Sequence, residues 1–87
     1  MTRANYLDRA RFICAEIVEE LRCTTLSHDY FNSSHEGYAV IKEEFDKLWE
    51  AIKQNHHHPN CELREEAIQV AAMVLRFILD CTEKEDD

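Results

Sequence analysis

The chain has 87 residues, of which 45% are hydrophobic, with only one glycine and one proline. This length predicts a single domain, residues 1–87, and the scarcity of helix breakers favours helices joined by short loops. The net charge of −8 disfavours a nucleic acid as partner, because the phosphate backbone is itself anionic. No segment has the apolar length of a membrane span or a signal peptide, so no membrane partner is expected and we predict a cytoplasmic location.

The first predicted helix covers about residues 4–23. Apolar side chains recur along it at three- and four-residue steps, and they are Leu7, Ala10, Cys14, Ile17 and Leu21, widened by Ile13 and Val18. These positions share one face of a helix, so we expect them to face the core. A connecting loop is expected over about residues 24–32.

The second predicted helix has the clearest start signal in the chain. Ser33 and Glu36 fit a capping box, in which each side chain satisfies an exposed N–H group of the first turn. The predicted inward stripe beyond this cap is Tyr38, Ile41, Phe45, Leu48 and Ile52, with Trp49 beside it. Pro59 is expected to end this segment, and Asn60 is a candidate cap for the next helix.

The third predicted helix covers about residues 61–81. One side of it is lined by Ala67, Val70, Ala71, Val74, Ile78 and Cys81. Because only about seven residues join the second and third helices, we expect them to form an antiparallel hairpin. The predicted fold is all-α, a three-helix protomer around this hairpin, with a charged tail at residues 83–87 that is expected to fray.

The four cysteines lack C-x-x-C spacing, so we expect reduced thiols. Cys14 and Cys81 fall on apolar faces and are predicted to be core residues. Cys23 and Cys61 lie near helix ends, and a bridge between these two stays open.

Two carboxylates of the predicted hairpin are best placed to look across the groove between its helices. Glu44 and Glu66 each lie about 80° from the centre of their apolar stripe, whereas Glu43 and Asp46 lie further round towards solvent. One or two carboxylates are enough to anchor Mg²⁺. The alternative is that these residues are surface charge, with Glu43 and Lys47 forming an i,i+4 ion pair.

The residues near the start of the second helix, and three aromatic residues, each have two interpretations. His35 and Gly37 indicate close approach by a ligand or a neighbouring backbone, or an ordinary first turn of a helix. Trp49, Tyr30 and Phe31 fit stacking on a nucleotide base, or packing in a core or dimer interface.

This pattern resembles the MazG-like all-α nucleoside triphosphate pyrophosphohydrolases over roughly residues 33–80. Their motif is Glu-Glu-x-x-Glu on one helix and Glu-x-x-Asp on the next; here residues 43–47 read Glu-Glu-Phe-Asp-Lys and residues 66–69 read Glu-Ala-Ile-Gln. The resemblance implies conversion of a nucleoside triphosphate to the monophosphate and pyrophosphate, with Mg²⁺ as cofactor and Mn²⁺ as a substitute. It also implies a homodimer or homotetramer in which helix pairs from two chains form a four-helix-bundle core.

By the same resemblance, Glu44 and Glu66 match metal ligands, and Glu43 matches the first acidic position; these three are the candidate catalytic residues. Two positions depart from the motif, since Lys47 stands where the family has its third Glu and Gln69 where it has Asp. A small helix rotation would let Asp46 act as the third metal ligand.

The candidate substrate-binding residues are Lys47, which would contact phosphate directly, with Gln69, His35 and Trp49. The two departures leave two functions open. One is a pyrophosphohydrolase of full, weakened or lost activity, and the other is a catalytically silent helical binding or assembly module that keeps the fold.

Overall fold

The computed structural model describes residues 2–27, 30–54 and 61–83, and every regular element in these ranges is helical, which confirms the all-α prediction. The elements are α1 (Arg3–Ser27), α2 (Ser34–Gln54), α3 (Cys61–Phe77) and a π-helical turn, η1 (Ile78–Thr82), that continues α3. Within the described ranges, no helix combines the length and the apolar character that a membrane span requires.

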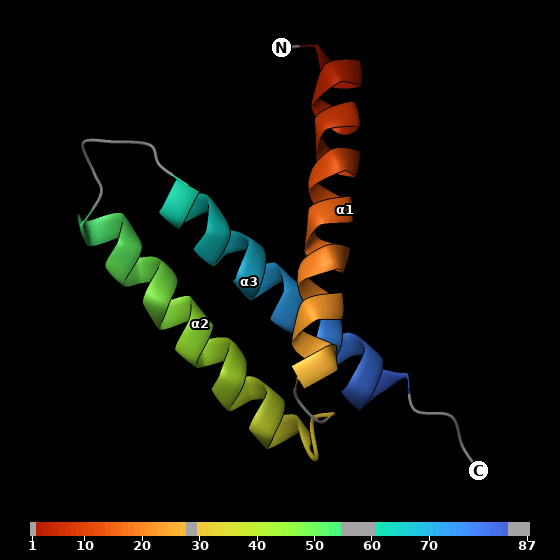
Figure 1. The fold of residues 1–87 in the computed structure, drawn as a ribbon, viewed down its shortest axis with the longest axis vertical. Helices are drawn as coiled ribbons and strands as arrows, with labels where there is room; N and C mark the ends of the chain where they lie inside the picture. The colour runs from red at the N-terminus through yellow and green to blue at the C-terminus, as the bar shows by residue number, and fades with distance from the viewer. Residues whose placement is uncertain (1, 28–29, 55–60, 84–87) are drawn as a thin grey trace.

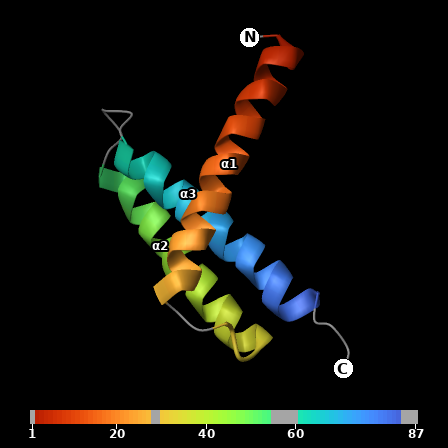
Figure 2. The same ribbon diagram turned by 45° about the vertical axis from the view of Figure 1, so that its right-hand side comes forward.

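Helices α2 and α3 lie side by side and run in opposite directions, and they form the largest helix–helix contact in the structure (Figures 1 and 2). This confirms the predicted antiparallel hairpin at the centre of the protomer. The C-terminal half of α1 packs across α3, whereas its N-terminal half extends past the hairpin (Figures 1 and 2).

The start of α2 is capped nearly as expected. The Glu36 N–H donates to Ser33 Oγ over 3.1 Å. The Glu36 carboxylate accepts from the Asn32 N–H, also at 3.1 Å, so it reaches one residue further back than in a standard capping box. The preceding residue, Phe31, is held by its own N–H, which donates to Asp80 Oδ2 of η1 over 3.0 Å.

The first helix is longer than predicted, because α1 continues to Ser27 where a loop was expected from residue 24. The hydroxyls of Thr24 and Thr25 donate to the carbonyl oxygens of Glu20 and Arg22. These side-chain bonds to the preceding turn keep polar residues compatible with a helix.

The core is small and lies where the three helices meet. Its buried members are Phe31, Ala72 and Met73, and the partly buried residues packed against them are Ile17, Leu21, Val40, Ile41, Phe77 and Cys81. The prediction for Cys14 is wrong: this residue is exposed, because the first α1 residue that packs against the core is Ile17. The predicted cap at Asn60, the frayed tail beyond residue 83 and the side chain of Cys61, with its possible bridge to Cys23, lie outside the described residues.

The apolar stripes predicted to face inward are largely exposed in the protomer. On α2, Tyr38 is 64% exposed and Phe45 is 61% exposed, and the side chains of Val74 on α3 and Ile78 at the start of η1 are also exposed. The side of α2 that is buried or half-buried consists of Gly37, Val40, Ile41, Glu44, Leu48 and Ala51. The inward face of α2 is therefore rotated by roughly 70° from the predicted stripe.

The rotation has a steric cause at the seam between α2 and α3. A Cβ atom on Gly37 would lie 2.6 Å from Phe77 Cδ2 and 3.1 Å from Phe31 Cδ2, and Ala51 and Ala72 are buried at other points of the helix pair. Small residues let two helices approach closely, so they take the contact face and the large aromatic residues are displaced from it. Gly37 thus serves close packing against two aromatic side chains, whereas the sequence indicated a ligand, a neighbouring backbone or an ordinary first turn.

Candidate functional site

The candidate site lies on the hairpin at Glu44 of α2 and Glu66 of α3, which are close enough for the charge of Glu44 to act on Glu66. The rotation of α2 brings Glu44 inside, so that only 16% of its side chain is exposed. In each glutamate the Oε2 atom is buried and accepts no hydrogen bond from the described residues. Because burying a carboxylate oxygen without a partner is costly, these two oxygens are the most unusual polar atoms of the hairpin.

The electrostatics of the site show that the two carboxylates act on each other. Burial raises the pKa of the Glu66 carboxyl above its ordinary value, and the charge of Glu44 raises this pKa further. Lys47 opposes both effects, because its positive charge lowers the pKa of Glu66. The Lys47 ammonium donates to Glu44 Oε1 over 3.2 Å, and this hydrogen bond raises the pKa of Lys47. Glu44, Glu66 and Lys47 therefore form one electrostatic cluster.

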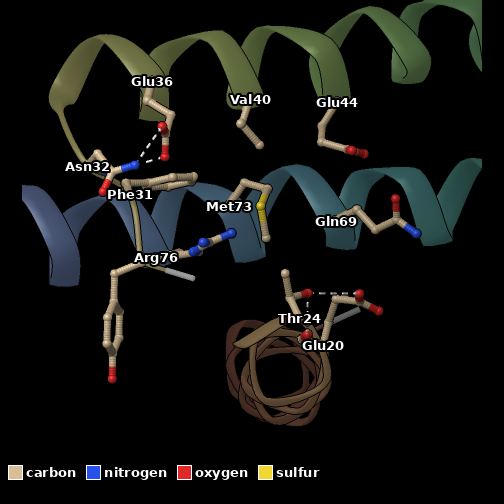
Figure 3. Close-up of a pocket in the computed structure, with 11 residues that line it drawn as sticks. Glu20, Thr24, Phe31, Asn32, Glu36, Val40, Glu44, Gln69, Met73 and Arg76 are labelled. Atoms are coloured by element: carbon tan, nitrogen blue, oxygen red, sulfur yellow. Dashed lines mark hydrogen bonds between the residues drawn. The ribbon is translucent and has the colours of Figure 1, made fainter. Parts of the chain in front are cut away.

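A cavity of about 540 Å³ lies on one side of this cluster, between the hairpin and the end of α1. Figure 3 shows Glu44 and Gln69 facing it from α2 and α3, with Glu20 and Thr24 of α1 opposite. Its other lining residues are Tyr30, Phe31, Asn32, Glu36, Val40, Met73 and Arg76. A smaller hollow of about 320 Å³ includes Asp46, Lys47 and Glu66. Glu44 thus borders the larger cavity and Glu66 borders the smaller hollow.

Arg76, which lines the larger cavity, forms a cluster with Phe31 and Asp80 that the sequence did not predict. Arg76 is only 5% exposed, and its guanidinium carbon lies 4.0 Å from the centre of the Phe31 ring. Arg76 Nε lies 3.5 Å from Asp80 Oδ2, and the same oxygen holds the backbone of Phe31. The only sequence signal was the i,i+4 spacing of Arg76 and Asp80 directly after the apolar run of residues 70–75.

Two of the predicted acidic site residues are not gathered at the site. Glu43 is exposed, and Asp46 is exposed and pairs with Lys42 over 3.0 Å. Among the residues that the structure describes, no three side chains of His, Cys, Asp or Glu lie close enough together to hold a metal ion. Asp46 lines the smaller hollow together with Glu66, but in this structure it pairs with Lys42 and is not grouped with Glu44 and Glu66 as a third carboxylate.

The predicted substrate-binding residues divide into two groups. Gln69 lines the larger cavity and Lys47 lines the smaller hollow. His35 and Trp49 are exposed and line neither hollow. Trp49 is 56% exposed, which excludes a place in the protomer core, and Lys53 Nζ lies 5.7 Å from the centre of its ring.

Comparison of the chain with protein-family models, with curated proteins and with solved structures found no match to any of them. The MazG-like resemblance therefore stays a hypothesis that rests on the residues of the helix pair themselves.

Proposed function

We propose that this protein is a MazG-like nucleotide pyrophosphohydrolase that uses Mg²⁺, or Mn²⁺ in its place, at Glu44 and Glu66. One observation carries the proposal: two glutamates from facing helices each bury a carboxylate oxygen that accepts no hydrogen bond from the described residues. A divalent cation would supply the missing partner of both oxygens at once and would remove the repulsion between the two charges.

The donor set suits a magnesium ion that is shared with a substrate. Mg²⁺ takes one or two protein carboxylates and completes its octahedron with water and phosphate oxygens. When bound, such an ion neutralises phosphate charge and activates a water molecule. The overall reaction adds water across the bond between the α- and β-phosphates, which breaks to give the monophosphate and pyrophosphate. A cation is needed for substrate binding as well, since the chain carries a net charge of −8.

The neighbouring polar residues have roles that this reaction would use. The Lys47 ammonium lies beside Glu44 and is half-exposed, so it is free to turn towards a phosphate group. Gln69 faces the 540 Å³ cavity next to Glu44 and offers an amide to the sugar or base. The volume of this cavity falls within the range typical of small-molecule sites, roughly 300–1,000 Å³.

Assembly of two hairpins into a four-helix core is part of the proposal. The exposed residues Tyr38, Phe45, Trp49 and Ile52 share one face of α2, and Val74 and Ile78 share one face of α3 and its continuation η1. Helical periodicity puts both faces on the side of the hairpin away from α1. Contiguous apolar surface of this kind marks an interface, and pairing with a second copy would turn the predicted inward stripes into a shared core.

A second function, a silent binding or assembly module, is favoured by the position of Lys47. Its ammonium already compensates Glu44 Oε1 without any metal, and it occupies the place of the third acidic residue in the motif. A cation beside the site repels a metal ion, so this contact weakens metal binding.

Pyrophosphate release from a panel of nucleoside triphosphates, with Mg²⁺ or Mn²⁺, distinguishes the two functions. On the proposed function, Glu44→Gln abolishes release while helicity by circular dichroism is unchanged. Asp8→Asn is the matched control, because it removes the same charge from an exposed position on α1 and is expected to retain full activity.

The absence of release from every triphosphate with the natural protein would reject the hydrolase in favour of the silent module. The double variant Lys47→Glu and Gln69→Asp then provides the decisive comparison. Activity that appears only in this variant would identify a fold that has lost its catalysis through these two positions.

A further inference from the structure

The N-terminal half of α1 is a projecting arm, defined here as residues 3–13. It extends beyond the hairpin in both views of the structure, and no other described element lies beside its first turns (Figures 1 and 2). Tyr6 is 66% exposed, Leu7 46% and Phe12 68%. Among the described residues of the arm only Ala10 and Ile13 are half-buried, so most of the surface of the arm is open to a partner.

The distribution of the apolar residues shows what kind of surface suits the arm. At about 100° per residue, Tyr6, Leu7 and Phe12 point in three different directions around the helix. A helix that lies flat on a membrane has one apolar face and one polar face. The arm has no single apolar face of this kind, so it does not fit a flat membrane surface.

The charge of the arm favours a second copy of this chain as its partner. The arm carries Arg3, Arg9 and Arg11 against Asp8, a net charge of +2. Since the whole chain carries −8, the remaining residues carry −10. The arm is therefore complementary in charge to the rest of its own chain, and a second copy is a partner that always brings this acidic surface.

One groove of the protomer has a charge opposite to that of the arm. It lies between α1 and α3, has a volume of about 460 Å³ and is lined by Glu16, Glu19, Glu20, Cys23, Arg64, Glu65, Ile68 and Gln69. Arg64 is its only cationic lining residue among those described, and it makes a bidentate pair with Glu16 at 2.6 and 2.5 Å. Among the described residues, Glu20 and Glu65 form no ion pair, so they leave the groove negative.

We propose that the arm of one copy docks in the α1–α3 groove of a second copy, with Arg9 and Arg11 against Glu20 and Glu65. The exchange is reciprocal, because each protomer carries both the arm and the groove, and a reciprocal contact closes as a two-fold dimer. This contact uses the side of the hairpin where α1 lies. It is separate from the apolar face of α2 and does not depend on the proposed hydrolase activity.

A charge-swap experiment tests the docking. One variant reverses the arm (Arg9→Glu with Arg11→Glu), and the other reverses the groove (Glu20→Arg with Glu65→Arg). Sedimentation equilibrium is expected to show self-association at least about tenfold weaker than in the natural protein for each variant alone. An equimolar mixture of the two is expected to recover the association, since each arm then meets a groove of opposite charge.

The controls separate docking from general charge effects. Glu43→Arg with Glu83→Arg makes the same change in net charge as the groove variant, at exposed positions outside the arm, the groove and the apolar face of α2, and is expected to leave self-association unchanged. Circular dichroism checks that each variant keeps its helicity. The proposal is overturned if the arm variant associates as tightly as the natural protein, or if the mixture associates no more tightly than its two components.

Discussion

The replacement Gly37→Ala tests the close contact that fixes the rotation of α2. The new Cβ atom would lie 2.6 Å from Phe77 Cδ2, well inside normal van der Waals separation, and 3.1 Å from Phe31 Cδ2 on another side. Overpacking of this kind costs roughly 1–3 kcal/mol, and the better helix propensity of alanine returns at most about 1 kcal/mol. We expect a net loss of about 1–2 kcal/mol, which lowers Tm by at least about 4 °C in a domain of this size.

The measurement is thermal unfolding by circular dichroism, with Ala39→Gly as the matched control. Ala39 is an exposed residue two positions further along α2, so its replacement reports helix propensity alone and is expected to cost about 0.5–1 kcal/mol. The reasoning is refuted if Gly37→Ala raises Tm by about as much as Ala39→Gly lowers it. That result would mean that Phe77 does not pack against the glycine.

Three further variants test the candidate site, the apolar face of α2 and the buried ion pair. Because the pKa of Glu66 is raised, its charged form destabilises the fold at pH values above this pKa, whereas the protonated form carries no such cost below the ordinary pKa. Glu66→Gln in EDTA should therefore raise the free energy of unfolding at about pH 7 and leave it unchanged near pH 3. An equal rise at both pH values would contradict this. Phe45→Ser with Trp49→Ser should lower the mass measured by light scattering, whereas an unchanged mass would exclude this face as an interface. Asp80→Asn should lower the free energy of unfolding in urea by roughly 3 kcal/mol, because buried Arg76 loses its counter-charge. A decrease below about 0.5 kcal/mol would show that the ion pair is dispensable.

The sequence was sufficient for the features that depend on near neighbours in the chain. Three helices follow from apolar periodicity and the scarcity of glycine and proline, and the cap of α2 follows from Ser33 and Glu36. The hairpin follows from the short connection between α2 and α3. These signals act within one or two helical turns, so they are readable without knowledge of the packing.

The sequence did not predict which face of each helix points into the core of the protomer. Periodicity identifies every apolar stripe of a helix as a candidate core face, but it does not say which neighbour covers it. In the protomer the α2–α3 seam takes small residues such as Gly37 and Ala51, and Tyr38 and Phe45 remain outside. Cys14 was misplaced for a related reason, since the length of α1 exceeds the length of the surface on which it packs.

For the candidate site, the sequence by itself singled out Glu44 and Glu66 over Glu43 and Asp46, because their angular positions lie nearer the apolar sides of the two helices. Only the tertiary structure decided that both glutamates bury an oxygen that accepts no hydrogen bond from the described residues. The physical reason is that burial and mutual repulsion arise between side chains on different helices, more than twenty positions apart in the chain. Local pattern carries no information on how closely two such helices approach or how they are rotated.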